Sequence, residues 1–247
     1  MSYITSSQCN RRIMKEIQEA MSDQMRQSGI YYWCNDANNV QGKAMIIGPE
    51  GTPYAHCPLI FDVLFPPSYP DTPHKLHFVT SDGYTRLHPN LYVNGKVCLS
   101  ILGTWKGPKW SPAMTVSTVL VSVQSLLDEN PIVNEPGYEE LTLKNSTAYS
   151  YADFVHSRMS AMSIRGLSHW KDGDIPPEWR EFEDVLDEIG DTLISKLANV
   201  IREKAKGEDI MYDGLVYSMR GKTEWKALQE VAERLTTHAS KIAQLGV

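Results

Sequence analysis

The sequence predicts an α+β protein, in which helical segments lie before and after an antiparallel sheet. Two patterns give this prediction. Between residues 42 and 80, three short apolar runs are each bounded by turns rich in Gly and Pro, as in an antiparallel meander. Before and after this region, apolar residues recur at every third or fourth position, which is the spacing of amphipathic helices.

The elements can be assigned in order along the chain. Helical spacing predicts a first helix over 11–26, and the three apolar runs predict strands at 43–47, 59–65 and 75–80. Residues 88–110 have neither period and are expected to form an ordered irregular segment. Further helices are expected at 115–127, at 153–165 with a stop at Gly166, from Pro176 to about 206, and at 222–245.

Length and composition exclude several classes of protein. The 247 residues suggest one main domain with a sizeable extension. No apolar run is long enough for a membrane span, and residues 1–10 contain no secretory signal, so an intracellular protein is expected. A net charge of −6 argues against nucleic acid as a partner. The four cysteines are widely spaced, which predicts free thiols and no metal site.

The irregular segment contains the residues that are best suited to catalytic chemistry. Cys98 follows an Asn94-Gly95 turn, and a thiol beside such a turn is expected to be shallow and reachable. Asn90 can fold back toward Cys98, where its amide could donate to an oxyanion or brace the loop. A cysteine hydrolase would need a histidine base. His88 precedes a proline ten residues from Cys98, so a packing and hydrogen-bonding role is favoured for its ring.

Several motifs in this order resemble the ubiquitin-conjugating enzymes. The active-site signature is similar in His-Pro-Asn at 88–90, Gly-x-Val-Cys-Leu at 95–99 and Trp-x-Pro at 110–112. The segments at 48–54, 65–70 and 11–16 resemble the family's strand, turn and first-helix patterns. The resemblance implies the ubiquitin-conjugating fold: an N-terminal helix, a four-stranded antiparallel meander and C-terminal helices. It places the catalytic domain at 8–165 and a helical C-terminal extension, packed on it, at 166–247.

The long connection from Leu99 to Trp110 resembles the large subclass of this family. Within that subclass the chain looks closest to the Z-type enzymes, which work with the alternative ubiquitin-activating enzyme and also carry a helical C-terminal extension. Whether the extension packs on the main domain, binds a partner or gates the site stays open. Its apolar stripes favour packing.

The resemblance implies a transferase of the ubiquitin conjugation pathway, located in the cytoplasm, the nucleus or both. Cys98 would accept ubiquitin, or a ubiquitin-like modifier, as a thioester from an activating enzyme. It would then pass the modifier to a substrate lysine or to a ubiquitin ligase. No cofactor or metal is expected on this chain, because ATP is used upstream by the activating enzyme. The alternative is a catalytically silent module of the same fold that only binds ubiquitin or a partner.

Site residues are carried over position by position. Asn90 matches the family asparagine that stabilises the oxyanion or the active-site loop. Many relatives have an acid two residues after the cysteine, where this chain has Ser100. Glu135 is the candidate for a second acidic residue that gates the site, although Asn134 could take its place.

The resemblance also implies docking residues. Arg12 and Lys15 are assigned to the face that binds the activating enzyme, and Pro112 and Ala113 to the loop that RING-type ligases contact. A third ligase-contact position, often aromatic in the family, is Asp71 here. This departure puts ordinary RING docking in doubt.

Overall fold

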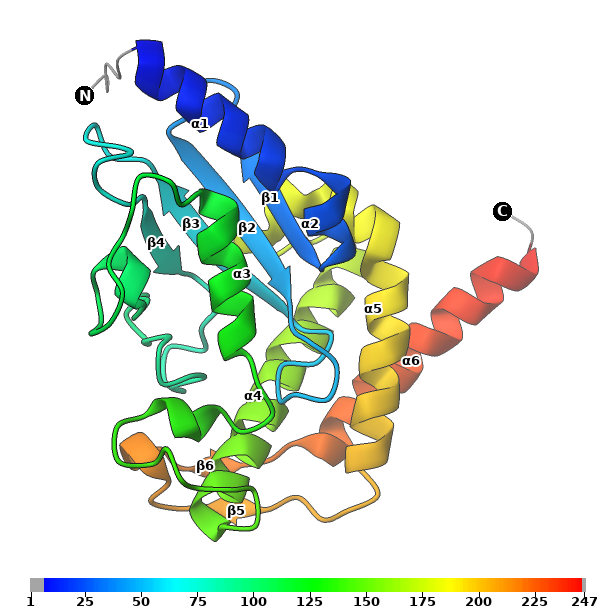
Figure 1. Cartoon of the computed structure of the whole chain (residues 1–247). Coiled ribbons are helices and arrows are strands. Elements are labelled where there is room, and N and C mark those ends of the chain that lie inside the picture. The colour runs from blue at the N-terminus through cyan, green and yellow to red at the C-terminus, as the bar shows by residue number, and fades with distance from the viewer. Residues whose placement is uncertain (1–6, 246–247) are drawn as a thin grey trace.

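The computed structural model describes the backbone of residues 7–245 and the side chains of residues 9–237. Most of the segment 1–10, in which the sequence shows no secretory signal, therefore lies outside the described residues. A four-stranded antiparallel sheet lies in the first half of the chain, and each strand pairs with the next: β1 (Ile30–Cys34), β2 (Gln41–Ile47), β3 (Pro58–Leu64) and β4 (Lys75–Phe78). The predicted α+β class and its antiparallel meander are confirmed (Figure 1).

Helices make up most of the remaining chain. The α-helices are α1 (Ser7–Ala20), α2 (Asp23–Gln27), α3 (Val116–Leu126), α4 (Ser146–Lys171), α5 (Glu183–Lys204) and α6 (Trp225–Leu245). Short 3-10 turns occur at η1 (Ser100–Leu102), η2 (Pro131–Asn134), η3 (Pro177–Phe182) and η4 (Val216–Ser218). A small hairpin pairs β5 (Met211–Tyr212) with β6 (Gly221–Lys222). No helix among the described residues is both long and apolar enough to cross a bilayer.

At the start of the chain, one local expectation is wrong and the pattern missed one strand. The single helix expected over 11–26 is divided into α1 and α2, because Ser22 adopts an extended conformation and caps α2 from its side chain. Apolar spacing alone did not show this break. Strand β1 was not assigned from the sequence pattern, because its five residues, Ile-Tyr-Tyr-Trp-Cys, do not alternate between apolar and polar.

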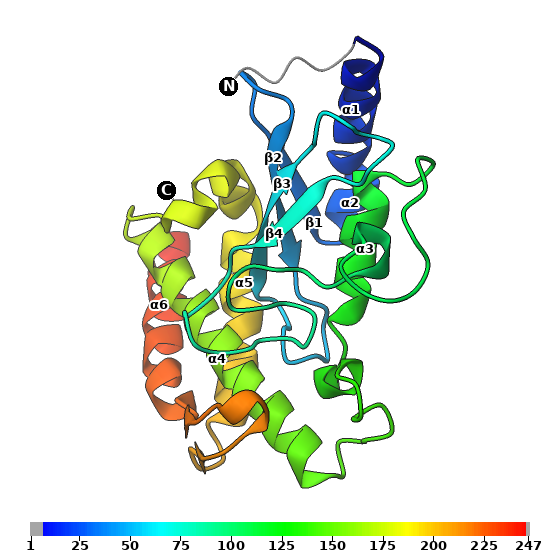
Figure 2. The same cartoon turned by 90° about the vertical axis from the view of Figure 1, so that its left-hand side faces the viewer.

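The sheet is buried on both faces. Consecutive strand residues point to opposite faces, yet Ala44, Met45 and Ile46 of β2 are all fully buried. Helices α1 to α3 lie on one side of the sheet and α4 to α6 on the other (Figure 2). Lys43 of β2 pairs with Glu181 of η3 at 3.6 Å, which ties the second face of the sheet to the C-terminal segments.

Gly166 does not stop a helix, contrary to the expectation from the sequence. Helix α4 continues through it to Lys171, because the missing side chain makes room for a tryptophan. A Cβ at Gly166 would lie 2.5 Å from the Trp179 ring, and a Cβ at Gly190 of α5 would lie 2.5 Å from the Trp170 ring. Gly166 of α4 thus accepts a tryptophan of η3, and Gly190 of α5 accepts a tryptophan of α4, which permits close packing at both places.

One hydrophobic cluster joins the expected catalytic domain and the expected extension. It contains sheet residues such as Phe61 together with Leu167 of α4, Leu197 of α5 and Leu228 of α6. Helix α4 also runs across position 165, so the helix that ends the first part begins the second. The division at 165/166 stays a prediction from the resemblance.

Candidate functional site

The buried imidazole of His88 anchors the site. Its Nε2 donates to the carbonyl of Leu126 at the end of α3 (2.9 Å), and its Nδ1 accepts from the amide of Asn90 (3.0 Å). Burial lowers the pKa of His88 to about 3, and the neighbouring Arg86 adds to this effect, so the ring is neutral at pH 7. Both ring nitrogens are occupied, so His88 is not available as a general base. It fixes the segment that leads to Cys98 to α3.

Asn90 and Cys98 form a closed pair across the turn between them. The Cys98 amide donates to the Asn90 carbonyl (2.8 Å), and the Asn90 side-chain amide donates to the Cys98 carbonyl (2.7 Å). The structure thus shows the Asn90 Nδ2 acting as a brace. The side-chain oxygen of Asn90, Oδ1, is buried without a hydrogen-bond partner among the described residues.

The turn between them needs glycine for two reasons. Gly95 has a φ of +83°, a conformation that side-chain-bearing residues rarely adopt. A Cβ at this position would also lie 1.9 Å from the His77 ring. The Asn94 side chain accepts from the amide of Lys96 (3.2 Å), which closes the turn, so the Asn-Gly pair is set by local geometry.

Cys98 is 2% exposed, which differs from the reachable thiol expected from the sequence. It lies outside the continuous hydrophobic cluster. The Thr104 hydroxyl accepts from the amide of Leu99 (2.9 Å) and donates to the carbonyl of Val97 (2.7 Å). Thr104 thereby folds the loop after η1 back onto the segment that carries the thiol.

The surroundings of the other three cysteines disfavour the thiolate. Burial raises the pKa of the Cys9, Cys34 and Cys57 thiols, and that of Cys57 to about 12. These groups are therefore protonated at neutral pH and are poor nucleophiles. Among the described residues, no cluster of three or more His, Cys, Asp or Glu side chains is arranged to hold a metal ion.

The two candidates for the gate residue have different surroundings. The Asn134 amide donates to Asp128 (3.3 Å) and to the carbonyl of Pro131 (3.2 Å), so it closes its own turn. Glu135 instead accepts from the Tyr217 hydroxyl at 2.6 Å. Beside it, Pro136 lines a surface hollow of about 460 Å³ with residues 103–106 of the loop that follows Cys98. The gate region therefore faces that loop.

The expected docking residues fall into two groups. Arg12 pairs with the buried Glu16 and donates to the carbonyls of Pro112 (3.1 Å) and Met114 (3.0 Å), so it joins α1 to the expected ligase loop. Lys15 and Ala113 are exposed, as are Pro112 and Asp71. The two expected docking surfaces are thus contiguous, and Arg12 is the link between them.

Sequence reasoning missed three residues that hold this region together. Glu16 also binds the Tyr69 hydroxyl and the amide of Val116 at the start of α3 (2.9 Å). Its position among apolar residues of α1 is the only sequence signal. Thr104 and Tyr217 gave no signal at all, because their partners are set by loop conformation.

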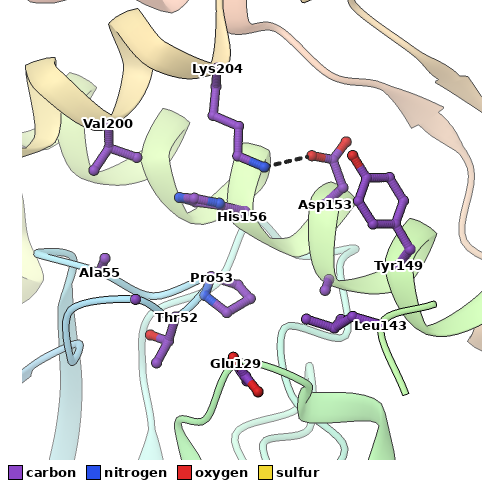
Figure 3. A pocket seen from close by; sticks show the side chains of 12 residues that line it. Thr52, Pro53, Ala55, Glu129, Leu143, Tyr149, Asp153, His156, Val200 and Lys204 are labelled. Carbon is purple, nitrogen blue, oxygen red and sulfur yellow. Dashed lines mark hydrogen bonds and ion pairs between the residues drawn. The ribbon is translucent and has the colours of Figure 1, made fainter. Parts of the chain in front are cut away.

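A second cavity lies at the junction of the sheet domain and the C-terminal helices (Figure 3). Its volume is about 310 Å³, and it is lined from the 51–55 turn, α4 and α5. Lys204 pairs with Asp153 across its wall at 3.1 Å, and Figure 3 shows His156 beside them. It contains no thiol, so the chemistry of Cys98 does not take place there.

Comparison with known proteins agrees with this geometry. A sequence profile described as "Ubiquitin-conjugating enzyme" matches residues 12–156. This chain belongs to that family. The matched region contains the His88–Asn90 segment, Cys98 and Glu135, and it ends within α4.

The individual relatives indicate which type of ubiquitin-conjugating enzyme the chain resembles. The chain is 43% identical over 137 residues to the human protein "Ubiquitin-conjugating enzyme E2 Z", which covers 55% of this chain and 38% of that protein. It is 44% identical over 136 residues to "Probable ubiquitin-conjugating enzyme protein 17" of Caenorhabditis elegans, covering 52% and 19%. It is 50% identical over 130 residues to "Putative ubiquitin-conjugating enzyme E2 39" of Arabidopsis thaliana, covering 51% and 40%. The resemblance to the Z type is confirmed, and the matches span less than half of each relative.

Proposed function

We propose that this chain is an active ubiquitin-conjugating enzyme that carries ubiquitin, or a ubiquitin-like modifier, on Cys98. The observation that carries the proposal is the closed Asn90–Cys98 pair, which holds a cysteine without a disulfide on a fixed segment in a chain of this family. The proposal includes an activating enzyme and a ligase as partners, protein substrates, and work in the cytoplasm or the nucleus. It requires no cofactor on this chain.

The loading step exchanges one thioester for another. The Cys98 sulfur attacks the modifier's C-terminal carbonyl while it is bound to the activating enzyme's cysteine. The new S–C bond forms, the old one breaks, and the proton lost by Cys98 ends on the departing thiol. Because one thioester replaces another, the exchange is close to balanced and needs no metal or nucleotide on this chain.

The transfer step forms an amide. A lysine has a solution pKa of about 10.4, so the incoming amine must first lose a proton to water. Its nitrogen then attacks the thioester carbon, the C–S bond breaks, and the second proton of the amine ends on the Cys98 thiolate. Asn90 holds the peptide that carries the sulfur, and Glu135 offers a carboxylate to the incoming ammonium.

The test is a charging assay. The protein is incubated with ubiquitin, ATP and each of the two ubiquitin-activating enzymes in turn, and the products are run on a gel with and without reductant. We expect an adduct that reductant removes and that Cys98→Ala abolishes, with the alternative activating enzyme as the effective donor. No adduct with either activating enzyme contradicts the proposal.

The burial of Cys98 favours the second candidate, a silent module of the same fold that only binds ubiquitin or a partner. The same assay separates the two. A silent module binds ubiquitin without forming an adduct, and Cys98→Ala leaves that binding unchanged.

A further inference from the structure

The C-terminal extension reaches the catalytic segment through residues 215–220, called here the clamp segment. The amide of Leu215 donates to the carbonyl of Met219 (2.9 Å), which closes the segment into a loop. The amide of Arg220 donates to the Tyr84 hydroxyl (2.8 Å), which anchors the loop to the sheet domain. The clamp segment is therefore held at both ends.

Tyr217 lies at the tip of the clamp segment in an unfavourable backbone conformation. Its φ is +62°, in the left-handed region that a bulky residue rarely adopts. Its ring packs edge-on against Tyr151 of α4, with centroids 6.0 Å apart. Burial, followed by the neighbouring Glu135, raises the pKa of Tyr217, so its hydroxyl keeps its proton and acts as a donor. Backbone strain of this kind persists where surrounding contacts require it.

The Tyr217 hydroxyl is directed at the candidate gate residue. It donates to Glu135 Oε2 at 2.6 Å, across 82 positions of sequence. The structure gives the other oxygen, Oε1, no hydrogen-bond partner among the described residues, so it stays available to a ligand. A carboxylate with one oxygen fixed and the other available suits the binding of an ammonium group.

A second set of contacts links Tyr217 to the residues that precede Asn90. The guanidinium of Arg86 lies 3.2 Å from the centroid of the Tyr92 ring and 5.0 Å from that of Tyr217. The same guanidinium donates to the carbonyls of His88 (3.1 Å) and Pro89. Tyr217 thus contacts both the gate carboxylate and the arginine that holds the segment leading to Asn90.

We propose that Tyr217 is a positioning residue for the amine-transfer step. Its hydroxyl holds Glu135 so that the available oxygen receives the ammonium of the incoming lysine. The C-terminal extension is then part of the acceptor site and not only a packing element. This inference rests on the proposed function, because it concerns the fate of a thioester on Cys98.

The test compares two nucleophiles in single-turnover discharge of ubiquitin from Cys98. Free lysine enters as an ammonium and depends on Glu135, whereas hydroxylamine is uncharged at neutral pH and does not. Tyr217→Phe removes only the hydroxyl and keeps the ring. We expect roughly tenfold slower discharge to lysine at pH 7, in keeping with the loss of a hydrogen bond to a charged group. Charging and discharge to hydroxylamine are expected at the wild-type rate.

Tyr84→Phe is the matched control. It removes another hydroxyl bond between the sheet domain and the clamp segment, but it does not touch Glu135. We expect Tyr84→Phe to discharge to both nucleophiles at the wild-type rate. The defect of Tyr217→Phe should also shrink as the pH is raised toward the solution pKa of lysine, about 10.4, because fewer amines then enter charged.

A double-mutant cycle shows whether Tyr217 acts through Glu135. In the Glu135→Ala background, Tyr217→Phe should cause no further loss on lysine. If Tyr217→Phe proves unstable, Glu135→Gln tests the same contact from the other side and should give the same selective loss. The inference is overturned by wild-type lysine rates in both variants, by equal slowing of both nucleophiles, or by additive effects in the cycle. Failure of the wild-type protein to charge contradicts the proposed function instead.

Discussion

Two fully buried neutral histidines make the stability of the protein sensitive to mild acid. His88 is 0% exposed and His74 is 1% exposed, and burial lowers the pKa of each to about 3. In the unfolded chain both return to an ordinary value of about 6.5. The unfolded state therefore binds more protons wherever the pH lies between about 6.5 and about 3. Stability is fully present above pH 6.5 and is lost as the pH falls through this window.

The size of the effect at pH 5.5 follows from the pKa values. One pH unit below 6.5, each histidine contributes a loss of about 1.4 kcal/mol, or about 3 kcal/mol for the pair. For a chain of this length, such a loss lowers the Tm by roughly 6–12 °C. His156, whose pKa burial lowers to about 4, acts in the same direction.

The assay is thermal unfolding, followed by intrinsic fluorescence at intervals from pH 7.5 to 5.5. His74 lies among aromatic rings, with its ring centroid 5.7 Å from that of Phe65 and 5.9 Å from that of Trp110, and neither ring nitrogen has a hydrogen-bond partner within the described part of the chain. His74→Phe should therefore keep the fold and remove about a third of the pH dependence, since His88 and His156 remain. A wild-type Tm that is constant over this range, or an unchanged slope in His74→Phe, would refute the reasoning.

Three substitutions test other contacts. Asn90→Ala removes the hydrogen bond to the Cys98 carbonyl. We expect a loss of about 1–2 kcal/mol in unfolding free energy and slower discharge to both lysine and hydroxylamine. Wild-type discharge rates would contradict the role of Asn90 as a brace. Thr104→Val removes two hydrogen bonds beside the thiol. It should speed the alkylation of Cys98 by iodoacetamide, measured by mass spectrometry. An unchanged rate would mean that Thr104 does not limit access of the reagent to the thiol. Gly166→Ala forces a methyl group against Trp179, at about 1–3 kcal/mol, against a gain of about 1 kcal/mol in helix propensity. The Tm should fall by a few degrees, and a rise would show that the ring moves freely.

Local pattern predicted the parts of the fold that local forces decide. The apolar runs that became β2, β3 and β4 lie within two residues of their expected bounds, and α3 begins one residue after Thr115, which caps it. Gly166 was misread because glycine has two opposite uses in a helix. It can end one, or it can admit a neighbour's side chain, and only the position of Trp179 decides between them.

The same limit applies to the candidate site. Asn90 and Cys98 lie close in sequence, so their pairing could be anticipated from the turn between them. The contact of Glu135 with Tyr217 could not, because it depends on how the whole extension returns to the sheet domain. The burial of Cys98 was also beyond reach from sequence, since it depends on the fold of the lengthened loop.

The length of helix α4 restricts how the sequence of this protein could change during evolution. The region shared with its relatives ends at 156, yet the helix continues to Lys171 and buries Met159, Ile164 and Leu167 beyond that point. A cut at the end of the shared region would remove these side chains and expose the core residues that they cover, at roughly 2 kcal/mol for each lost side chain. The segment that matches the family profile is therefore shorter than the unit that packs around one core. Changes beyond 156 are constrained by packing even where the shared pattern has ended.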